Sequence, residues 1–271
     1  LEVSGAPDLG RWDELPSHVE QNFMRLLDLF ASANVQVTCF FLGWVAERFP
    51  HLVKKAASYD HEIASHGYAH RLVFEMTARA FRDDALRARH VLEDLTGRAV
   101  AGYRSAGFSV TEETNWFYEC LLEAGYQYDS SIFPAVRQHG GIVNAPRAPH
   151  IVRTQSGPIF EFPITVTDVC GRGLCFFGGG YLRLFPYTLI RTMTSRVIRE
   201  GRPVIFYIHP REIDTTHPRL PMPMYRRFKS YVNLGTTAAK IQNIISEFPL
   251  VTFREFLAGC TVGPEQPSQA T

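Results

Sequence analysis

Apolar positions along the chain alternate between the helical period and the nearly continuous runs of buried strands. A first helix is predicted where apolar residues recur at the helical period, at Val19, Phe23, Leu26, Leu27 and Phe30. Ser17 and Glu20 have the spacing of a capping box, which indicates the start of this helix. Residues 35–42 then form a run that is apolar almost throughout. Such a run is typical of a strand buried on both faces, as in a parallel sheet.

The same patterns predict helices and strands in alternation down to residue 248. Further helices are predicted at 44–59, 77–95, 112–123, 186–200 and 235–248. Pro50 marks a new helix start within the first of these ranges, and Gly97 is a typical C-cap after the second. Strands are predicted at 62–66, 100–104, 127–130, 159–166 and 204–209.

This alternation predicts an α/β fold built from βα units around a parallel sheet. About 250 residues of such units is the usual size of a parallel barrel wrapped by helices. A doubly wound open sheet is the alternative, but no GxGxxG follows the first predicted strand. The one glycine run, at residues 178–180, comes late in the chain. We expect one domain over residues 1–261 and a disordered tail over residues 262–271, which are rich in Gly, Pro, Ser and Gln.

Charge and cysteine content exclude several classes of function. The chain of 271 residues has 28 basic and 27 acidic side chains, and this near balance argues against a nucleic-acid binder. No run approaches 18 consecutive apolar residues, so we expect no transmembrane segment. The five cysteines are scattered and include no CxxC. This favours reduced thiols and a cytoplasmic protein, with the periplasm as the alternative.

Candidate chemistry lies at the carboxyl ends of the predicted strands, where parallel barrels place their catalytic groups. His66 ends one strand and His70 follows it, at a spacing that lets two imidazoles reach one metal ion. Imidazole suits zinc, cobalt, nickel and iron. Taken alone, two histidines at this spacing are more often ordinary surface or core residues. Their place directly after a buried strand favours the ligand interpretation.

Three other strand ends carry polar groups with two interpretations each. His209 is either a core histidine or a general acid at the barrel mouth. Arg104 is either a surface cation or a buried one that needs a carboxylate partner. Asp129 is either a turn cap or, if it lies beside His209, the group that fixes the tautomer of that ring.

These residues lie in strings that resemble the polysaccharide deacetylases, the carbohydrate esterases with NodB homology. The string HEIASHGYAH, which includes His66 and His70, is similar to their metal motif. The strings YRSA, YQYDSSIFP and IHP resemble the third, fourth and fifth motifs. The strings CFFLGWVAERFP, YDSSIFP, GGGYLRLFP and FYIHPREID occur in the order seen in the subfamily found beside exopolysaccharide and exosortase loci. The resemblance covers about residues 11–257.

The resemblance implies a fold, a cofactor and an activity. The fold would be a distorted barrel of seven or eight parallel strands, with a subfamily extension over about residues 211–257. The cofactor would be a divalent metal, such as zinc, with cobalt or nickel as alternatives. The reaction would remove the N-acetyl group from an aminosugar in a polysaccharide or its precursor, so the partner would be an N-acetylated glycan.

The resemblance also assigns roles to single residues. His66 and His70 would hold the metal, and His209 would protonate the leaving amine. Arg104 would orient a catalytic carboxylate, and Asp129 would tune His209. Two aromatic side chains, those of Phe133 and Tyr181, would line the sugar pocket.

One part of the family pattern is absent from this sequence. The first motif, a pair of carboxylates at the end of a first strand, would precede a stretch similar to residues 1–15. Two explanations are open: either the sequence is trimmed, which we favour, or the pair has been lost. Loss would predict a glycan-binding protein without turnover on the same fold. A third possibility is an amidase for a small non-sugar amide. Smaller departures are Asp60 before the metal motif, Gly67 within it, and Ser105-Ala106 after Arg104.

Overall fold

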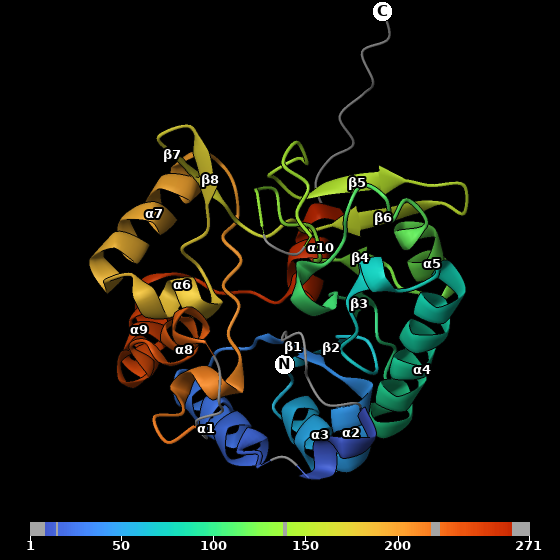
Figure 1. Cartoon of the computed structure of the whole chain (residues 1–271), viewed down its shortest axis with the longest axis horizontal. Coiled ribbons are helices and arrows are strands. Elements are labelled where there is room, and N and C mark those ends of the chain that lie inside the picture. Colours follow the sequence, from blue (N-terminus) through green and yellow to red (C-terminus); the bar gives the residue numbers. More distant parts are fainter. Residues whose placement is uncertain (1–8, 15, 138–139, 218–222, 262–271) are drawn as a thin grey trace, which may run out of the picture.

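A mostly parallel sheet forms the centre of the protein (Figure 1). The computed structural model describes residues 9–14, 16–137, 140–217 and 223–261. The six strands are, in spatial order, β1 (Thr38–Phe41), β2 (Glu62–Ser65), β3 (Gly102–Tyr103), β4 (Tyr128–Asp129), β6 (Pro158–Glu161) and β5 (His150–Arg153). All neighbours pair in parallel except β5, which is antiparallel to β6. The predicted α/β class with a parallel sheet is therefore confirmed.

The sheet does not close into a barrel within the described part of the chain. The predicted strand at 204–209 pairs only through an isolated bridge between Tyr207 and Gly178. The ring of Tyr207 packs so closely on Gly178 that a Cβ there would lie 2.4 Å from Tyr207 Cδ1. A separate hairpin, β7 (Thr167–Val169) with β8 (Arg172–Leu174), falls outside the central sheet.

Helices surround the strands on the outside of the molecule (Figure 1). They are α1 (Val19–Ser32), α2 (Gly43–Arg48), α3 (Pro50–Ser58), α4 (Ala78–Thr96), α5 (Phe117–Glu123), α6 (Gly179–Leu184), α7 (Tyr187–Arg199), α8 (Met224–Tyr231), α9 (Leu234–Glu247) and α10 (Phe253–Thr261). Short 3-10 turns are η1 (Leu9–Glu14), η2 (Val73–Glu75), η3 (Ala106–Phe108) and η4 (Pro210–Ile213). None of the helices described is both long and apolar enough to cross a membrane.

Local sequence signals place the start of α3 and both ends of α4. Pro50 begins α3 as predicted. The Thr77 hydroxyl accepts a hydrogen bond from Ala80 N at the start of α4, and Gly97 ends that helix in the left-handed conformation, at φ 65°.

One predicted cap and one predicted helix start are wrong. Helix α1 begins at Val19 with His18 as its N-cap, and Glu20 Oε1 lies 2.8 Å from His51 Nε2 instead of closing a capping box. Helix α5 begins at Phe117 rather than 112, because Thr114 Oγ1 donates to Thr111 O at 2.8 Å and accepts from Thr111 N at 3.1 Å. This closed turn leaves the preceding residues outside the helix.

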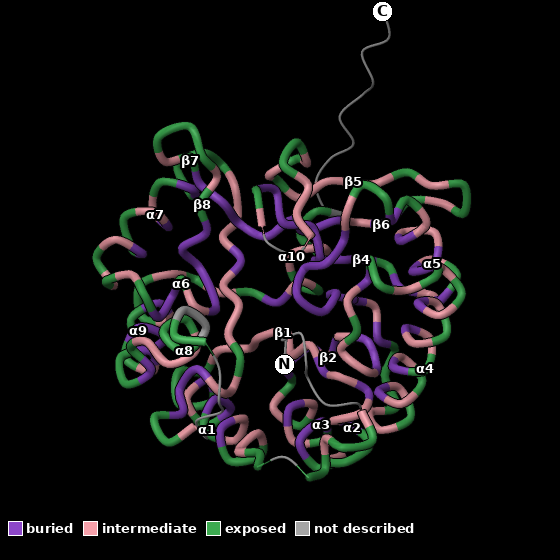
Figure 2. The backbone as a smooth tube through the Cα atoms, viewed as in Figure 1, coloured by how far each residue is buried: buried purple, intermediate pink, exposed green. Residues whose placement is uncertain are grey.

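Buried residues concentrate toward the centre of the molecule, and exposed ones lie on its periphery (Figure 2). Helix α10 contributes aromatic rings to this core. Phe253 stacks on Tyr128 with ring centroids 5.4 Å apart and meets Phe162 at 4.6 Å. The C-terminal helix therefore packs directly against strand β4 and the segment after β6.

A buried carboxylate joins α10 to the starts of three strands. Glu62, the first residue of β2, is 5% exposed. Its oxygens accept from Thr38 Oγ1 at 2.6 Å, Tyr128 Oη at 2.9 Å and the backbone N–H of Arg254 at 3.0 Å. A carboxylate at a helix N-terminus also interacts favourably with the helix dipole. Glu62 thus connects β1, β2, β4 and α10.

A buried cation holds α9 against the end of α6. Lys240 Nζ donates to the carbonyl oxygens of Leu182, Arg183 and Phe185 at 2.9, 2.9 and 2.7 Å. The last carbonyl groups of a helix have no partner within it, so an ammonium group is a suitable donor for them.

We expect Lys240→Met to lower the free energy of unfolding by about 3 kcal/mol, because two buried carbonyl groups and one half-buried carbonyl group lose a charged donor. Chemical denaturation measures this loss. The exposed Lys54 is the matched control, and Lys54→Met should leave the midpoint unchanged. A Lys240→Met protein as stable as the Lys54→Met protein would contradict the role of this contact.

Candidate active site

The strand register brings the predicted site residues into one row. Ser65 pairs with Tyr103, Tyr103 with Asp129, and Asp129 with Glu161. The residues that follow these positions therefore emerge together at the carboxyl edge of the sheet. His66 follows the first and Arg104 the second, so this edge is where the candidate chemistry gathers.

His66 and His70 lie together in the structure. Their ring centroids are 5.2 Å apart. His66 Nδ1 lies 2.7 Å from the carbonyl oxygen of Arg104. A carbonyl group only accepts hydrogen bonds, so Nδ1 carries the proton and Nε2 keeps its lone pair. Metal-binding histidines are typically oriented by a hydrogen bond of this kind.

The loop between the two histidines is held from outside. Asp84, on α4, accepts hydrogen bonds from the backbone N–H groups of Tyr68 at 2.8 Å and Ala69 at 3.2 Å. Gly67 has a φ of 74°, and a Cβ there would lie 2.9 Å from Asp84 Oδ1. Glycine at this position is therefore explained by the close approach of Asp84.

Burial keeps both imidazoles neutral. Desolvation is the largest cause that lowers the pKa of His66, to about 3, and it also lowers the pKa of His70. A neutral ring is the form that binds a metal ion. Two half-buried, neutral and adjacent imidazoles are thus chemically suited to be metal ligands.

Arg104 is buried without an ion pair among the described residues. Its Nε donates to Ser130 O at 3.0 Å and its Nη2 to Ser130 Oγ at 2.7 Å, while the guanidinium lies 4.2 Å from the centre of the Phe40 ring. Burial lowers its pKa to about 10, which leaves it a cation at neutral pH. A buried cation of this kind can bind a carboxylate strongly.

Asp129 belongs to a buried acid pair. Its oxygens accept from Ser131 N at 3.0 Å and Ser131 Oγ at 2.6 Å. Desolvation raises its pKa to about 6. Burial, followed by the charge of Asp129 and a hydrogen bond to it, raises the pKa of Glu161 well above its usual value. Burial thus favours the protonated form of both carboxyl groups, and no local sequence pattern indicates this pairing.

The carboxylate that meets His209 is Glu212, not Asp129. Glu212 Oε1 lies 3.0 Å from His209 Nδ1, and its side chain is 3% exposed. The short turn η4 places these two residues three apart on one side of the chain. The suggested pairing of Asp129 with His209 is thus corrected, because the hydrogen bonds of Asp129 go to Ser131. The His–Pro–Arg–Glu spacing is the signal that would have indicated Glu212.

The two predicted sugar-contacting aromatics have different surroundings. Phe133 is 3% exposed, and its ring lies 6.1 Å from that of Phe108. It is therefore a core residue rather than an open platform for a sugar. Tyr181, on α6, is 39% exposed. The backbone N–H of Gly179 donates to Tyr207 O, which places this helix start beside the segment that leads to His209.

The described residues supply part of a metal site. No group of three His, Cys, Asp or Glu side chains within them could hold a metal ion. The pair of His66 and His70 fits two ligand positions, because both rings are neutral and one has its tautomer fixed. No described carboxylate completes the set.

Comparison with known proteins divides the chain into two matched segments. Residues 11–128 match the family model "Polysaccharide deacetylase", and residues 130–258 match "Domain of unknown function (DUF3473)". Site residues occur in both segments, with His66, His70 and Arg104 in the first and His209 in the second.

Characterised relatives are similar to the first part of the chain. A peptidoglycan deacetylase of Helicobacter pylori is 34% identical over 113 residues, which is 42% of this chain and 38% of that protein. A peptidoglycan-N-acetylglucosamine deacetylase of Bacillus cereus is 33% identical over 75 residues, 28% of this chain and 27% of that protein. The chain thus spans well under half the length of these relatives.

A solved structure shows the fold over most of the chain. A protein of Mycobacterium smegmatis, described as a polysaccharide deacetylase, aligns with a TM-score of 0.61. The alignment covers 92% of this chain and 81% of that protein, at 19% sequence identity. The two proteins therefore share a fold.

The buried pair of Asp129 and Glu161 predicts how the stability of the protein depends on pH. The folded state raises the pKa of Glu161, so its contribution to stability is present at low pH and is lost as the pH rises through the folded value. Facing charged or titratable groups are Asp129, Tyr118 and Arg104. Glu161→Gln removes this proton linkage. We expect the variant to lose less stability than the wild type between pH 4.5 and 8.

Denaturant unfolding at several pH values measures this difference, which can reach about 1.4 kcal/mol per pH unit for one proton. Glu14 is exposed, and Glu14→Gln is the control that should keep the wild-type slope. Parallel pH curves for Glu161→Gln and the wild type would refute the protonated pair.

Proposed function

We propose that this chain, which belongs to the polysaccharide deacetylase family, removes N-acetyl groups from an aminosugar in a polysaccharide or its precursor. The observation that carries the proposal is the hydrogen bond from His66 Nδ1 to Arg104 O, which fixes the lone pair of His66 beside the ring of His70. The relatives named as peptidoglycan deacetylases support the same class of reaction.

His66 and His70 would supply two ligands of a divalent metal, with zinc as the first candidate and cobalt or nickel as alternatives. Such a metal, when bound, polarises a carbonyl group and lowers the pKa of a bound water. The two residues come from one loop, and the Asp84 carboxylate holds that loop by accepting hydrogen bonds from two of its backbone N–H groups. The protein therefore presents both imidazoles in a fixed arrangement before any ligand arrives.

His209 is proposed to donate a proton to the leaving amine. Because Glu212 Oε1 accepts from His209 Nδ1, the proton available to a substrate is the one on Nε2. The His209 side chain is 52% exposed, so a substrate can reach it, whereas Glu212 is buried behind it. Glu212 would be a positioning residue that fixes the ring.

Arg104 is proposed to orient a carboxylate at the reaction centre. Ser130 fixes one side of its guanidinium through two hydrogen bonds, and the Phe40 ring covers another. A cation held in this way has little freedom to move, so it can position an acid without a large loss of entropy.

Metal content provides the first test. In the protein expressed from its complete gene and purified without chelator, we expect about one divalent metal per chain by elemental analysis. His66→Ala and His70→Ala should lose it, since each removes a ligand. His51→Ala, at an exposed histidine on α3, should retain it. Full metal content in both ligand variants would rule out the proposed site.

Acetate release from N-acetylated glycans tests the proposed role of His209 as the general acid. His209→Ala should lower kcat by about 10²- to 10⁴-fold, the usual contribution of a general acid. Glu212→Gln should lower it by about 10- to 100-fold, since an amide keeps the contact but removes the charge. Glu200→Gln, at a surface site, is the control. Unchanged kcat in the His209→Ala protein, with a normal unfolding midpoint, would exclude this role.

A further inference from the structure

One side of helix α8 presents large apolar side chains to water and has no part in the roles described so far. Met224 is 87% exposed and Phe228 is 58% exposed. The two residues are four apart on the helix, so they project from one face, and Arg227 lies beside them. Met224, Arg227 and Phe228 are called the α8 face below. Neighbouring apolar side chains that stay open to water mark candidate interaction surfaces.

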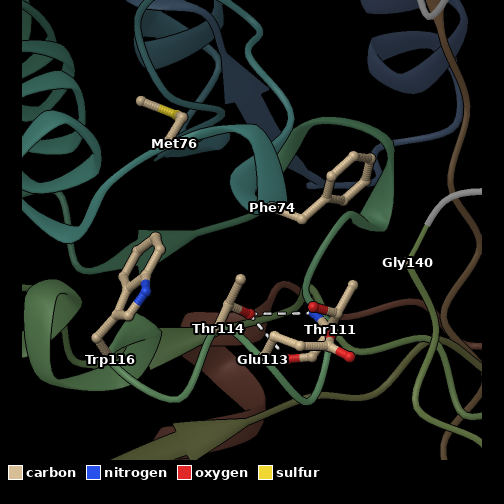
Figure 3. A pocket seen from close by; sticks show the side chains of 7 residues that line it. All are labelled: Phe74, Met76, Thr111, Glu113, Thr114, Trp116 and Gly140. Atoms are coloured by element: carbon tan, nitrogen blue, oxygen red, sulfur yellow. Dashed lines mark hydrogen bonds between the residues drawn. The ribbon is translucent and has the colours of Figure 1, made fainter.

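The exposed ring of Phe74 has a different setting. Phe74 is 39% exposed, and it forms part of the wall of a pocket of about 570 Å³ (Figure 3). Trp116 lies on another side of the same space. That pocket accounts for the exposure of Phe74. The residues of the α8 face are not among those that line it, so their exposure has another cause.

Helix α8 is attached to the protein by its end rather than by its side. Among the side chains of this helix that the structure describes, none is buried. Arg183 donates to Lys229 O at 2.8 Å and to Ser230 O at 2.6 Å. Arg211 donates to Ser230 O at 3.0 Å. Cations at the last carbonyl groups fix a helix end, so α8 is held in place while its apolar side chains stay outside the core.

The charge of this part of the chain indicates what binds there. Residues 130–258 contain 16 Lys and Arg but 7 Asp and Glu, whereas residues 1–129 contain 12 and 19. Residues 215–246, which include α8, contain five Lys and Arg and no Asp or Glu. An asymmetry of this kind between the halves of a chain is typical of proteins that bind an anionic partner.

The apolar side chains of α8 favour a lipid surface over an anionic polymer. A soluble polyanion would bind the basic groups and leave Met224 and Phe228 in water. An anionic bilayer uses both kinds of side chain, because its headgroups attract Lys and Arg and its acyl boundary accepts apolar groups. A basic helix with exposed Met and Phe therefore has the composition of a helix that lies in a membrane interface.

The attachment of α8 also relates this surface to the candidate site. Arg211, which binds Ser230 O, belongs to the turn η4. The same turn contains Glu212 and follows directly after His209. A bilayer bound at α8 would thus lie close to the turn of the proposed general acid.

We propose that the α8 face is a docking site for an anionic lipid bilayer, with α8 lying along the headgroup region. Binding is reversible, since one short helix inserts few apolar groups. The inference is separate from the proposed deacetylase function, because it invokes no reacting group, and its test does not depend on acetate release.

Cosedimentation of the full chain with vesicles tests the docking site. One set of vesicles is phosphatidylcholine alone, and the other contains phosphatidylglycerol as well. We expect binding to the anionic vesicles to exceed binding to the neutral ones by about tenfold or more, and to weaken as NaCl is added, because salt screens the headgroup charge.

Substitutions on the α8 face separate the two contributions. Arg227→Gln should weaken binding to anionic vesicles by about fivefold, the factor for one basic residue at such a surface. Met224→Ala and Phe228→Ala should each weaken it by about threefold or more, since each removes an apolar group that enters the bilayer.

Arg79→Gln and Val251→Ala are the matched controls. Arg79 is an exposed cation on α4, and Val251 is 60% exposed before α10. Both variants should bind as the wild type does, and thermal unfolding checks that every variant is folded.

Several outcomes would overturn the docking site. These are no vesicle binding by the wild type, equal binding to neutral and anionic vesicles, or unchanged binding by the folded Met224→Ala and Phe228→Ala proteins. Soluble polyglutamate provides a further probe. Polyglutamate binding that is as tight as vesicle binding, and that Phe228→Ala leaves unchanged, would assign the surface to an acidic polymer instead.

Discussion

The parallel register of β2, β3, β4 and β6 is the constraint on which the candidate site depends. Backbone hydrogen bonds tie Arg104 N to Ser65 O and Ser130 N to Tyr103 O, so each strand ends level with the next. A slip of one residue in any strand would turn its side chains to the other face. His66 would then lose the Arg104 carbonyl group, and Arg104 would lose Ser130. The chemistry of the site is therefore a property of strand pairing as much as of side-chain identity.

Burial of polar groups along this edge is stabilised by mutual hydrogen bonding rather than by solvent. Ser105 N donates to Ser131 Oγ, which in turn donates to Asp129, and the charge of Asp129 raises the pKa of Glu161. Most of these groups thus find a partner after removal from water, although Ser105 Oγ has none among the described residues. The resulting network is continuous from the histidine pair to the far side of the sheet, which explains why its members lie so deep in the protein.

Sequence reasoning identified the features that depend on local pattern. The start of α3 follows from Pro50 and the end of α4 from Gly97, and the position of His66 follows from its place after an apolar strand. It did not identify features that depend on long-range contact. The raised pKa of Glu161 and the core position of Phe133 require knowledge of neighbours far apart in the chain. The contact of Glu212 with His209 could have been predicted from their spacing of three residues, but the family resemblance assigned that role to Asp129.

The contacts of Glu62 have a consequence for whether the two matched segments could fold separately. The two matched segments meet at residue 129, inside β4, and Glu62 in the first segment receives the start of α10 from the second. A cut at that boundary would divide β4, which pairs with β3 and β6, and would separate α10 from the carboxylate of Glu62. The two segments of this chain are therefore parts of one folded unit, although separate family models describe them.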